Sequence, residues 1–488
     1  MSNSFVENLE RNTSFTYTEN GAICLDSTSN GLLDLFSTIG AIRQSDDNRK
    51  KALFDRAVAE DKELATKILF YGRDVREGLG ERQTFRTLLA YAADKYPEIV
   101  VPNIPYIGEY GRYDDLYCLV DTKCEDKMWS YMQKQFVEDC RNMADGKSVS
   151  LLAKWIKTPD ASSKTTRALG IRTAVGMGFG KNIPSYKRQL KALRKYIDVV
   201  EIKVSSNDFS AISYEKVPSN AMTKYRRLFG IKDADRFAKY LEDVASGKKT
   251  INASTLFPYD IVEKILYGHE NSKVLEAQWN ALPNYVEDGT NVLVMADVSG
   301  SMYGRPMASA IGLAMYFAER AKGPFHNKFM TFSHNPKLES IVGADLESKV
   351  RNLHDADWGY NTDLDATFEV ILNTAVKSHT PAEELPRALV IVSDMQIDGC
   401  VDATDTFYNT WKAKFESAGY EIPNVIFWNV NSMSNTFHAD ANIVGVQLLS
   451  GHATSTFKTL LDNLDKTAVE AMMSVLLSDR YAPIKVAA

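Results

Sequence analysis

The pattern of apolar and polar residues changes once along the chain, near residue 285. From about residue 30 to 280, apolar residues recur three and four positions apart, as in "NGLLDLFSTIGAIR" and "DKELATKILFYGRDV". This spacing predicts amphipathic helices. Prolines interrupt the pattern repeatedly, so the helices are expected to be short. We therefore predict a module of stacked helical repeats, a solenoid or ring, over residues 21–285.

After residue 290, short runs rich in Val, Ile and Phe alternate with helical segments such as "LDATFEVILNTAVKS". The runs are "NVLVMADVS", "NKFMTFS", "RALVIVSDM", "NVIFWNVN" and "ANIVGVQLL". Strands of this kind, separated by helices, predict a doubly wound, mostly parallel sheet with helices on both faces, here over residues 290–480. We expect residues 1–20 to be a flexible N-terminus and residues 481–488 to be a short tail.

The length and composition agree with this division. A chain of 488 residues is expected to form two or three domains, and 44% apolar with 25% charged residues is typical of a soluble globular protein. No run approaches 18 apolar residues, so no membrane partner is expected. The start of the chain lacks the features of a secretion signal, and the five cysteines have no metal-binding spacing. We predict a cytoplasmic protein.

The net charge of -6 is unevenly distributed. Residues 147–249 contain 22 Lys and Arg against nine Asp and Glu, a net charge of +13, whereas residues 250–488 contain 17 against 29, a net charge of -12. The basic part would attract a polyanion, and the acidic part would repel one. The alternative interpretation is a set of solvated helix faces with no partner.

The stretch "NVLVMADVSGSMYGRPM" indicates a metal site. Its apolar run ends at Asp297, and Ser299 and Ser301 follow at alternate positions, at the carboxyl edge of the predicted sheet where ligands bind. Thr362 in "WGYNTDLDA" and Asp394 at the end of "RALVIVSD" add two more oxygen ligands. Such ligands suit Mg²⁺ or Mn²⁺. The alternative is that Asp297 and Thr362 merely cap helices.

The same five residues, in this order on an alternating strand and helix pattern, resemble the metal-ion-dependent adhesion site (MIDAS) of von Willebrand factor A domains. The resemblance extends from residue 290 to about 480. It implies that the two serines and the threonine bind the metal directly or through water, and that the aspartates bind it largely through water. It also implies that an acidic group from a protein partner completes the coordination.

The N-terminal part resembles a family found in phages, bacteria, fungi and plants in which a helical module precedes an A domain. Segments such as "FYGRDVREGLGERQTFRTLLAYAADKYPEIV" and "YKRQLKALRKYIDVVE" carry this resemblance. The architecture also resembles, more distantly, the Ro autoantigen proteins with their TROVE module. In Ro proteins a ring of helical repeats, closed by an A domain, binds small structured RNAs on its outer surface and single-stranded RNA ends in its hole. The resemblance implies an RNA partner.

Two basic segments contain the candidate RNA-binding residues. "KNIPSYKRQLKALRK" places four cations along one helical face, and "NAMTKYRRLFG" adds three more. In the second segment Tyr225 and Phe229 would stack on bases, or alternatively form part of the core. The candidate residues are Lys187, Lys191, Arg194, Lys195, Lys224, Arg226 and Arg227.

The sequence gives little indication of catalysis. It contains no HExxH and no G-x-S-x-G motif, and "GRDVREGLGER" and "EYGRYDDL" are typical of salt-bridged helix junctions. We assign no chemistry to Asp398 in "DMQIDG". The leading hypothesis is a non-catalytic, Ro-like RNA-binding protein. The alternatives are a metal-dependent protein-interaction module and, more remotely, a metal-assisted hydrolase.

Overall fold

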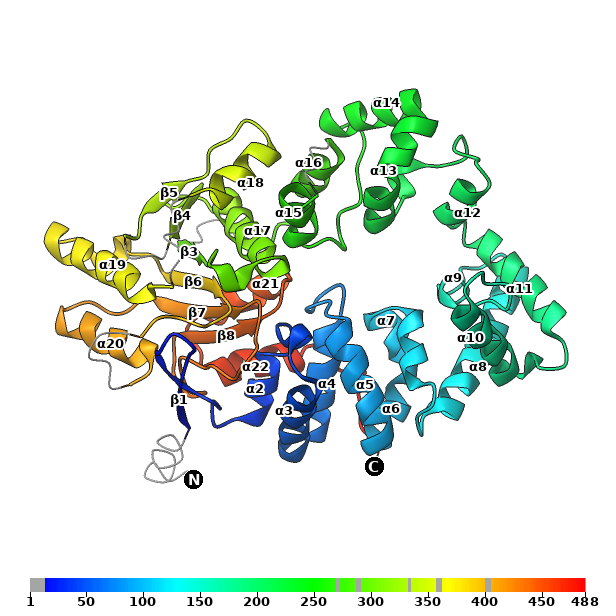
Figure 1. Cartoon of the computed structure of the whole chain (residues 1–488), viewed down its shortest axis with the longest axis horizontal. Coiled ribbons are helices and arrows are strands. Elements are labelled where there is room, and N and C mark those ends of the chain that lie inside the picture. Colours follow the sequence, from blue (N-terminus) through cyan, green and yellow to red (C-terminus); the bar gives the residue numbers. More distant parts are fainter. Residues whose placement is uncertain are drawn as a thin grey trace.

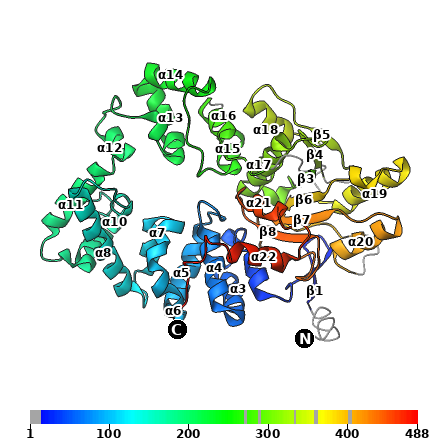
Figure 2. The ribbon, with the colours of Figure 1, turned by 180° about the vertical axis from the view of Figure 1, so that it is seen from behind.

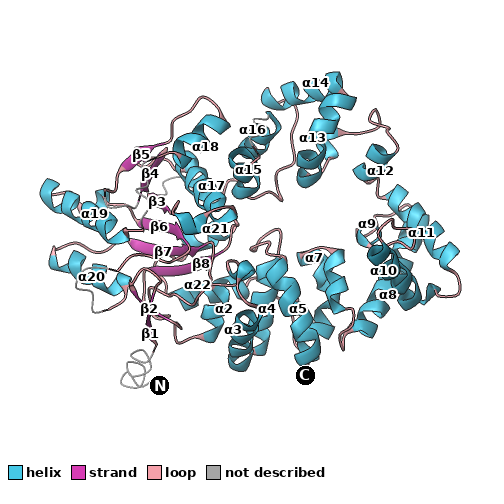
Figure 3. Cartoon of the chain, viewed as in Figure 1, coloured by secondary structure: helices cyan, strands magenta, loops and turns pink. Residues whose placement is uncertain are grey.

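The computed structural model describes residues 14–268, 273–286, 291–331, 335–356, 362–399 and 405–487. Its helices follow a curved path that starts and ends at a single α/β domain (Figures 1 and 2). All strands of the main sheet lie in that domain, and the curved part is helical (Figure 3). The predicted fold class, a helical module followed by a mostly parallel sheet, is confirmed.

The helical module contains mostly short helices, joined by connections that range from one residue to more than ten. The longest, α8, has 20 residues. The helices are α2 (Gly31–Phe36), α3 (Asp47–Glu60), α4 (Lys62–Arg73), α5 (Gln83–Lys95), α6 (Pro97–Val100), α7 (Ile107–Tyr110), α8 (Glu125–Ala144), α9 (Leu152–Trp155), α10 (Lys164–Ala174), α11 (Ile183–Tyr196), α12 (Val200–Ser205), α13 (Ser219–Lys232), α14 (Ala234–Ala245), α15 (Pro258–Leu266) and α16 (Lys273–Asn280).

The segments with mixed charge are ion-paired helix junctions, as the sequence predicts. Arg73 at the end of α4 and Arg86 on α5 both contact the buried carboxylate of Asp115, at 2.8 and 2.5 Å. Arg86 also lies 3.0 Å from Asp114, which Arg112 contacts at 2.8 Å. A buried carboxylate that keeps two guanidinium partners fixes the register of the surrounding turns, because losing one partner would leave a charge uncompensated.

The α/β domain has a six-stranded sheet in the order β5-β4-β3-β6-β7-β8, with only β5 antiparallel to its neighbour. The sequence predicts five of these strands but not β5, which is three residues long and partly exposed. The strands are β3 (Val292–Ala296), β4 (Lys328–Thr331), β5 (Leu338–Ser340), β6 (Ala388–Ser393), β7 (Asn424–Asn429) and β8 (Val446–Ser450). The helices are α17 (Arg305–Arg320), α18 (Leu346–His354), α19 (Leu364–Ser378), α20 (Phe407–Ser417), α21 (Thr456–Leu461) and α22 (Ala468–Leu476).

Helices cover both faces of the sheet. Successive side chains of a strand point to opposite faces, and β7 shows the two sides. The Phe427 ring lies 6.4 Å from Phe407 of α20, whereas the Trp428 ring lies 6.2 Å from Phe317 of α17. Because both faces are buried, the parallel strands are apolar throughout rather than alternating. No helix in the described ranges is long and apolar enough to cross a bilayer.

The helical module contacts the α/β domain at both of its ends. At one end α15 lies against α17 so closely that a Cβ on Gly312 would be 2.9 Å from Pro258 Cβ. At the other end α22 packs on α2 and α4. There Arg480 donates to both oxygens of Asp74, at 2.7 and 2.9 Å. The path of the helices is therefore closed by the domain that follows them in sequence.

Two terminal segments differ from the prediction. Residues 14–20, expected to be flexible, include β1 (Phe15–Tyr17), which pairs with β2 (Ile23–Leu25) in a hairpin on the α/β domain. Residues 1–13 lie outside the described part. The expected tail is also packed: Tyr481 and Ile484 are buried, and the Ala487 N–H donates to Glu98 O at 3.0 Å. The partly buried Phe15 in the first segment, and the buried Tyr481 and Ile484 in the second, pack on the main hydrophobic core and stabilise these contacts.

Candidate metal site and nucleic-acid interface

Two aspartates lie side by side at the point of the sheet where the strand order reverses. From β3 the chain continues to β4 on one side, and from β6 it continues to β7 on the other, so the carboxyl ends of β3 and β6 form a topological switch point. Asp297 directly follows β3 and Asp394 directly follows β6. The two strands are in continuous parallel register, and the Asp297 N–H donates to Val392 O at 2.8 Å. The parallel pairing therefore brings both carboxylates to one position.

Hydrogen bonds hold these carboxylates and the neighbouring hydroxyls in place. Asp297 accepts from the Ser299 N–H through Oδ1 and from the Ser393 hydroxyl through Oδ2, both at 2.8 Å. The Ser299 and Ser301 hydroxyl oxygens lie 3.1 Å apart, and the Ser301 hydroxyl hydrogen-bonds to Asp394. Four of the five predicted ligands are therefore linked directly to one another. Ser393 directly precedes Asp394 and positions Asp297 through its hydroxyl group. The sequence did not indicate this role.

The electrostatics of this cluster are unfavourable without a cation. Asp297 is 2% and Asp394 is 4% exposed. Burial, followed by the charge of Asp394, raises the pKa of Asp297 to about 6. Burial also raises the pKa of Asp394, while the hydrogen bond from Ser301 opposes that shift. Neither Asp297 nor Asp394 forms an ion pair among the described residues, and no cationic side chain is among the main causes of either pKa shift. A bound cation would therefore compensate their charge.

The donor set has the chemistry of a hard divalent cation. It consists of carboxylate and hydroxyl oxygens, which suit Mg²⁺ or Mn²⁺. Within the described ranges there is no group of three or more His, Cys, Asp or Glu side chains placed to hold a metal. The cluster lacks the nitrogen and sulfur ligands of a typical zinc site. The residues present therefore fit the metal that the sequence predicts.

Thr362 lies at the same edge but in a second layer of contacts. Its buried hydroxyl donates to Asp398 Oδ1 at 2.7 Å and accepts from Asn20 Nδ2 at 2.9 Å. It also lies 3.1 Å from Gln396 O, and the Gln396 N–H donates to Asp394 Oδ1 at 3.1 Å. Thr362 thus reaches the carboxylate cluster through Gln396, whereas the other four ligands contact one another directly. Asp398, to which the sequence analysis assigned no chemistry, orients the Thr362 hydroxyl.

The basic surface is centred on α11, whose packing determines which cations face outward. Its buried side chains Tyr186, Leu190 and Leu193 recur at helical spacing. On the opposite face Lys187, Lys191 and Lys195 are exposed, and so is Arg188. Lys187 lies 2.7 Å from Asp160. Among the described residues no ion pair involves Lys191, Lys195 or Arg188.

The placement of Arg194 differs from the prediction. Its guanidinium turns toward the core and donates to Ala153 O at 2.8 Å and to Ile156 O at 2.7 Å. Burial lowers the pKa of Arg194. The expectation that this residue lies on the exposed basic face is wrong. It follows Leu193 directly and lies closer to the buried face than Lys191 and Lys195, and the two carbonyl groups need a donor there.

The second basic segment, on α13, is only partly exposed. Lys224 is exposed over the Tyr225 ring, 4.9 Å from its centroid. Arg226 is half-buried, donates to Thr223 O, and has its pKa lowered by burial. Arg227 is exposed. Phe229 is fully buried in a small separate core of the α12–α14 region, with Tyr225 packed against it. The core interpretation of Phe229 is therefore correct, and the residue is unavailable for base stacking.

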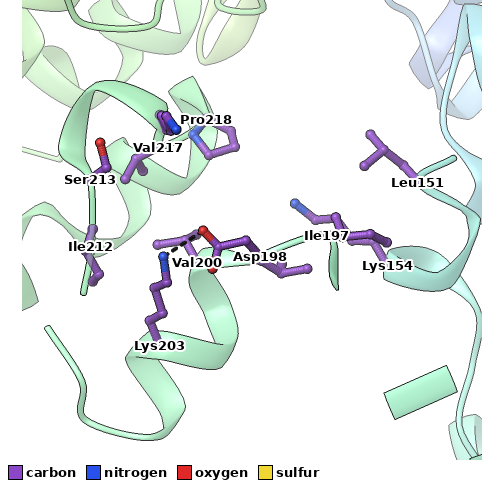
Figure 4. Close-up of a pocket in the computed structure, with 12 residues that line it drawn as sticks. Leu151, Lys154, Ile197, Asp198, Val200, Lys203, Ile212, Ser213, Val217 and Pro218 are labelled. Atoms are coloured by element: carbon purple, nitrogen blue, oxygen red, sulfur yellow. Dashed lines mark hydrogen bonds and ion pairs between the residues drawn. The ribbon is translucent and has the colours of Figure 1, made fainter. Parts of the chain in front are cut away.

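A cavity of about 200 Å³ lies beside the connection from α11 to α12, with residues 212–218 forming another part of its wall (Figure 4). Its lysines are largely neutralised: Lys203 lies 2.8 Å from Asp198, as Figure 4 shows, and Lys154 lies 3.8 Å from Glu201. Apolar side chains such as Ile212 and Val217 form much of the remaining wall. The exposed face of α11 is consequently the stronger site for an anion than this cavity.

Comparisons with known proteins divide the chain at the same point as the fold. A family model described as "Domain of unknown function (DUF2828)" matches residues 18–147 and 181–291. A second, described as "Domain of unknown function (DUF7788)", matches residues 291–480. The chain is 29% identical over 504 residues to the uncharacterized protein L728 of Acanthamoeba polyphaga mimivirus, covering 94% of this chain and 87% of that protein. Among solved structures it is similar to the Ro (RSR) protein of Deinococcus radiodurans, with 12% identity, a TM-score of 0.46, and coverage of 84% of this chain and 93% of the other.

The two orientations of the α11 cations predict unequal effects on stability. Replacing Arg194 with Gln removes a charged donor from two carbonyl groups, so we expect the free energy of unfolding to fall by about 2 kcal/mol. Replacing Lys191 with Gln removes the same charge from an exposed position and should change it by less than about 0.5 kcal/mol. Urea unfolding followed by tryptophan fluorescence measures both. Equal effects of the two variants would contradict the structural role of Arg194.

Proposed function

We propose that the protein binds RNA through the exposed basic face of α11, extended by Lys224 and Arg227 on α13. The observation that carries the proposal is the charge of α11: the helix contains five Lys and Arg and no Asp or Glu. Lys187, Lys191 and Lys195 stand in a row of about 12 Å along it, since four residues span about 6 Å of helix. Such a row matches a polyanion better than a single acidic group.

The position of α11 in the fold supports the proposal. Helices α8–α11 lie at the far side of the curved path from the sheet (Figure 1). The acidic α/β domain is therefore kept away from the basic face and would not repel a bound polyanion there. RNA is proposed rather than another polyanion because of the resemblance of the sequence to the Ro proteins. The function involves binding only and no catalytic step.

The salt dependence of binding tests this proposal. Replacing Lys191 and Lys195 with Gln removes two phosphate contacts, so the slope of log K against log salt should flatten by about 1.5 units. A control with Lys377→Gln and Lys412→Gln removes the same charge from exposed positions on the α/β domain and should leave the slope unchanged. Fluorescence anisotropy with a labelled structured RNA measures both. The proposal fails if the two double variants behave alike, or if the protein does not bind RNA at about 50 mM salt.

A second candidate function is metal-dependent recognition of an acidic partner at the switch point. The observation that favours it is the pair of buried carboxylates, Asp297 and Asp394, neither of which forms an ion pair among the described residues. We propose that these aspartates, with Ser299 and Ser301, hold Mg²⁺ or Mn²⁺, and that Thr362 orders the loop beside it. When bound, the metal would supply a coordination position for a carboxylate. EDTA would abolish this recognition but leave binding of RNA to α11 intact.

Addition of Mg²⁺ should stabilise the protein, because a cation that binds only the folded state compensates the buried carboxylates. We expect millimolar Mg²⁺ to raise the unfolding temperature of the wild type relative to EDTA. Asp297→Asn should abolish the response and should not destabilise the metal-free protein at neutral pH, since a buried charge is removed. Asp345→Asn, at the N-cap of α18, is a matched control because Asn caps equally well. Asp345→Asn should retain the full rise in unfolding temperature with Mg²⁺. Loss of that rise in both variants would contradict the metal site.

A further inference from the structure

The turn of the N-terminal hairpin lies directly on the metal edge of the sheet. The Thr18 hydroxyl donates to Ile397 O at 2.8 Å, and the Glu19 N–H donates to Gln396 Oε1 at 2.8 Å. Asn20 donates through Nδ2 to Gln396 O at 2.7 Å and accepts from the Gly399 N–H at 3.2 Å. The turn is thus bound to residues 396–399, the loop that follows Asp394.

The rest of the hairpin fixes this position. Leu25 and Phe437 exchange backbone hydrogen bonds at 2.8 and 3.0 Å, so β2 is tied to the α/β domain beyond the turn. Cys24 and Leu25 are buried. The turn therefore does not depend on its own few contacts for its location. Some 375 residues of chain separate Glu19 from Asp394, so no local pattern in the sequence predicts the contact.

Glu19 brings a third carboxylate to this edge. Gln396 links the Glu19 backbone to the carboxylate cluster, because its side chain accepts from the Glu19 N–H and its own N–H donates to Asp394 Oδ1. The negative charge of Glu19 raises the pKa of Asp394. The Glu19 side chain is exposed and forms no ion pair among the described residues. A third negative charge beside two buried ones is repelled in the metal-free protein and attracted once a divalent cation is present.

The Glu19 carboxylate is not grouped with those of Asp297 and Asp394 in the structure, so it would have to turn inward to reach a metal there. We propose that the exposed Glu19 side chain makes this turn when a metal is held by Asp297, Ser299, Ser301 and Asp394, and becomes its acidic ligand, so that the protein closes its own metal site with its N-terminal turn. The inference rests on the metal site proposed above. The carboxylate that the A-domain resemblance assigns to a partner is then supplied within the chain. A partner with an acidic side chain would have to displace the turn from residues 396–399 before it reached the metal.

The structure offers a matched pair of variants to test this. Glu19→Gln removes the carboxylate and keeps the size and exposure of the side chain. Asp26→Asn removes one negative charge from the other end of the same hairpin, where the Asp26 N–H donates to Ser14 O. Mn²⁺ affinity of the full-length protein is measured by electron paramagnetic resonance, with Asp297→Asn as the variant that lacks the site. Hydrogen exchange of residues 14–25 is measured with and without Mn²⁺.

We expect Glu19→Gln to weaken Mn²⁺ binding by about tenfold, in the range found when groups around a metal are removed. Asp26→Asn should bind as the wild type does. Mn²⁺ should slow hydrogen exchange in the turn of the wild type but not in Glu19→Gln. If Asp297→Asn loses Mn²⁺ while Glu19→Gln binds it as tightly as Asp26→Asn, the role of Glu19 is overturned and the metal site stands. If the wild type binds no Mn²⁺, the metal site itself is wrong and the inference falls with it.

Discussion

The closed shape of the molecule depends on the contacts between the α/β domain and the first helices, and the ion pair between Arg480 and Asp74 is one of these contacts. Asp74 is fully buried, and Tyr481 lies between the rings of Tyr71 and Tyr110, 6.0 and 5.8 Å from their centroids. Loss of Arg480 would leave a buried carboxylate without its main partner. Together with the contact of α15 on α17, this pair holds both ends of the helical module against one domain. The basic face of α11 is thereby kept at a fixed distance from the acidic sheet.

This arrangement separates two groups of uncompensated charge, the exposed cations of α11 and the buried carboxylates at the switch point. On α11 Arg188, Lys191 and Lys195 are exposed and form no ion pair among the described residues, so they remain available to an external polyanion. At the switch point Asp297 and Asp394 are buried together by the parallel pairing of β3 and β6, and their repulsion favours a bound cation. RNA binding and metal binding are thus proposed for different parts of the chain and should be separable by experiment.

The sequence predicts those features that follow from local periodicity. Five strands, the helix over residues 364–378 and the clustering of Asp297 with Asp394 are predicted, because apolar period and strand order determine them. The sequence does not predict the inward turn of Arg194, because the two carbonyl groups that accept its hydrogen bonds lie about 40 residues earlier in the chain. It also misses the packing of Tyr481 and the placement of Glu19, because both depend on contacts between opposite ends of the chain. Long-range contacts of this kind leave no pattern in a single sequence.

Crosslinking tests most directly whether the polyanion and the metal occupy different parts of the molecule, as we propose. Full-length protein is irradiated with RNA in the presence of Mg²⁺, and the crosslinked peptides are identified by mass spectrometry. We expect crosslinks within residues 147–249, concentrated on α11 and α13, and unchanged when EDTA replaces Mg²⁺. Crosslinks concentrated in residues 291–480, or lost on addition of EDTA, would contradict it.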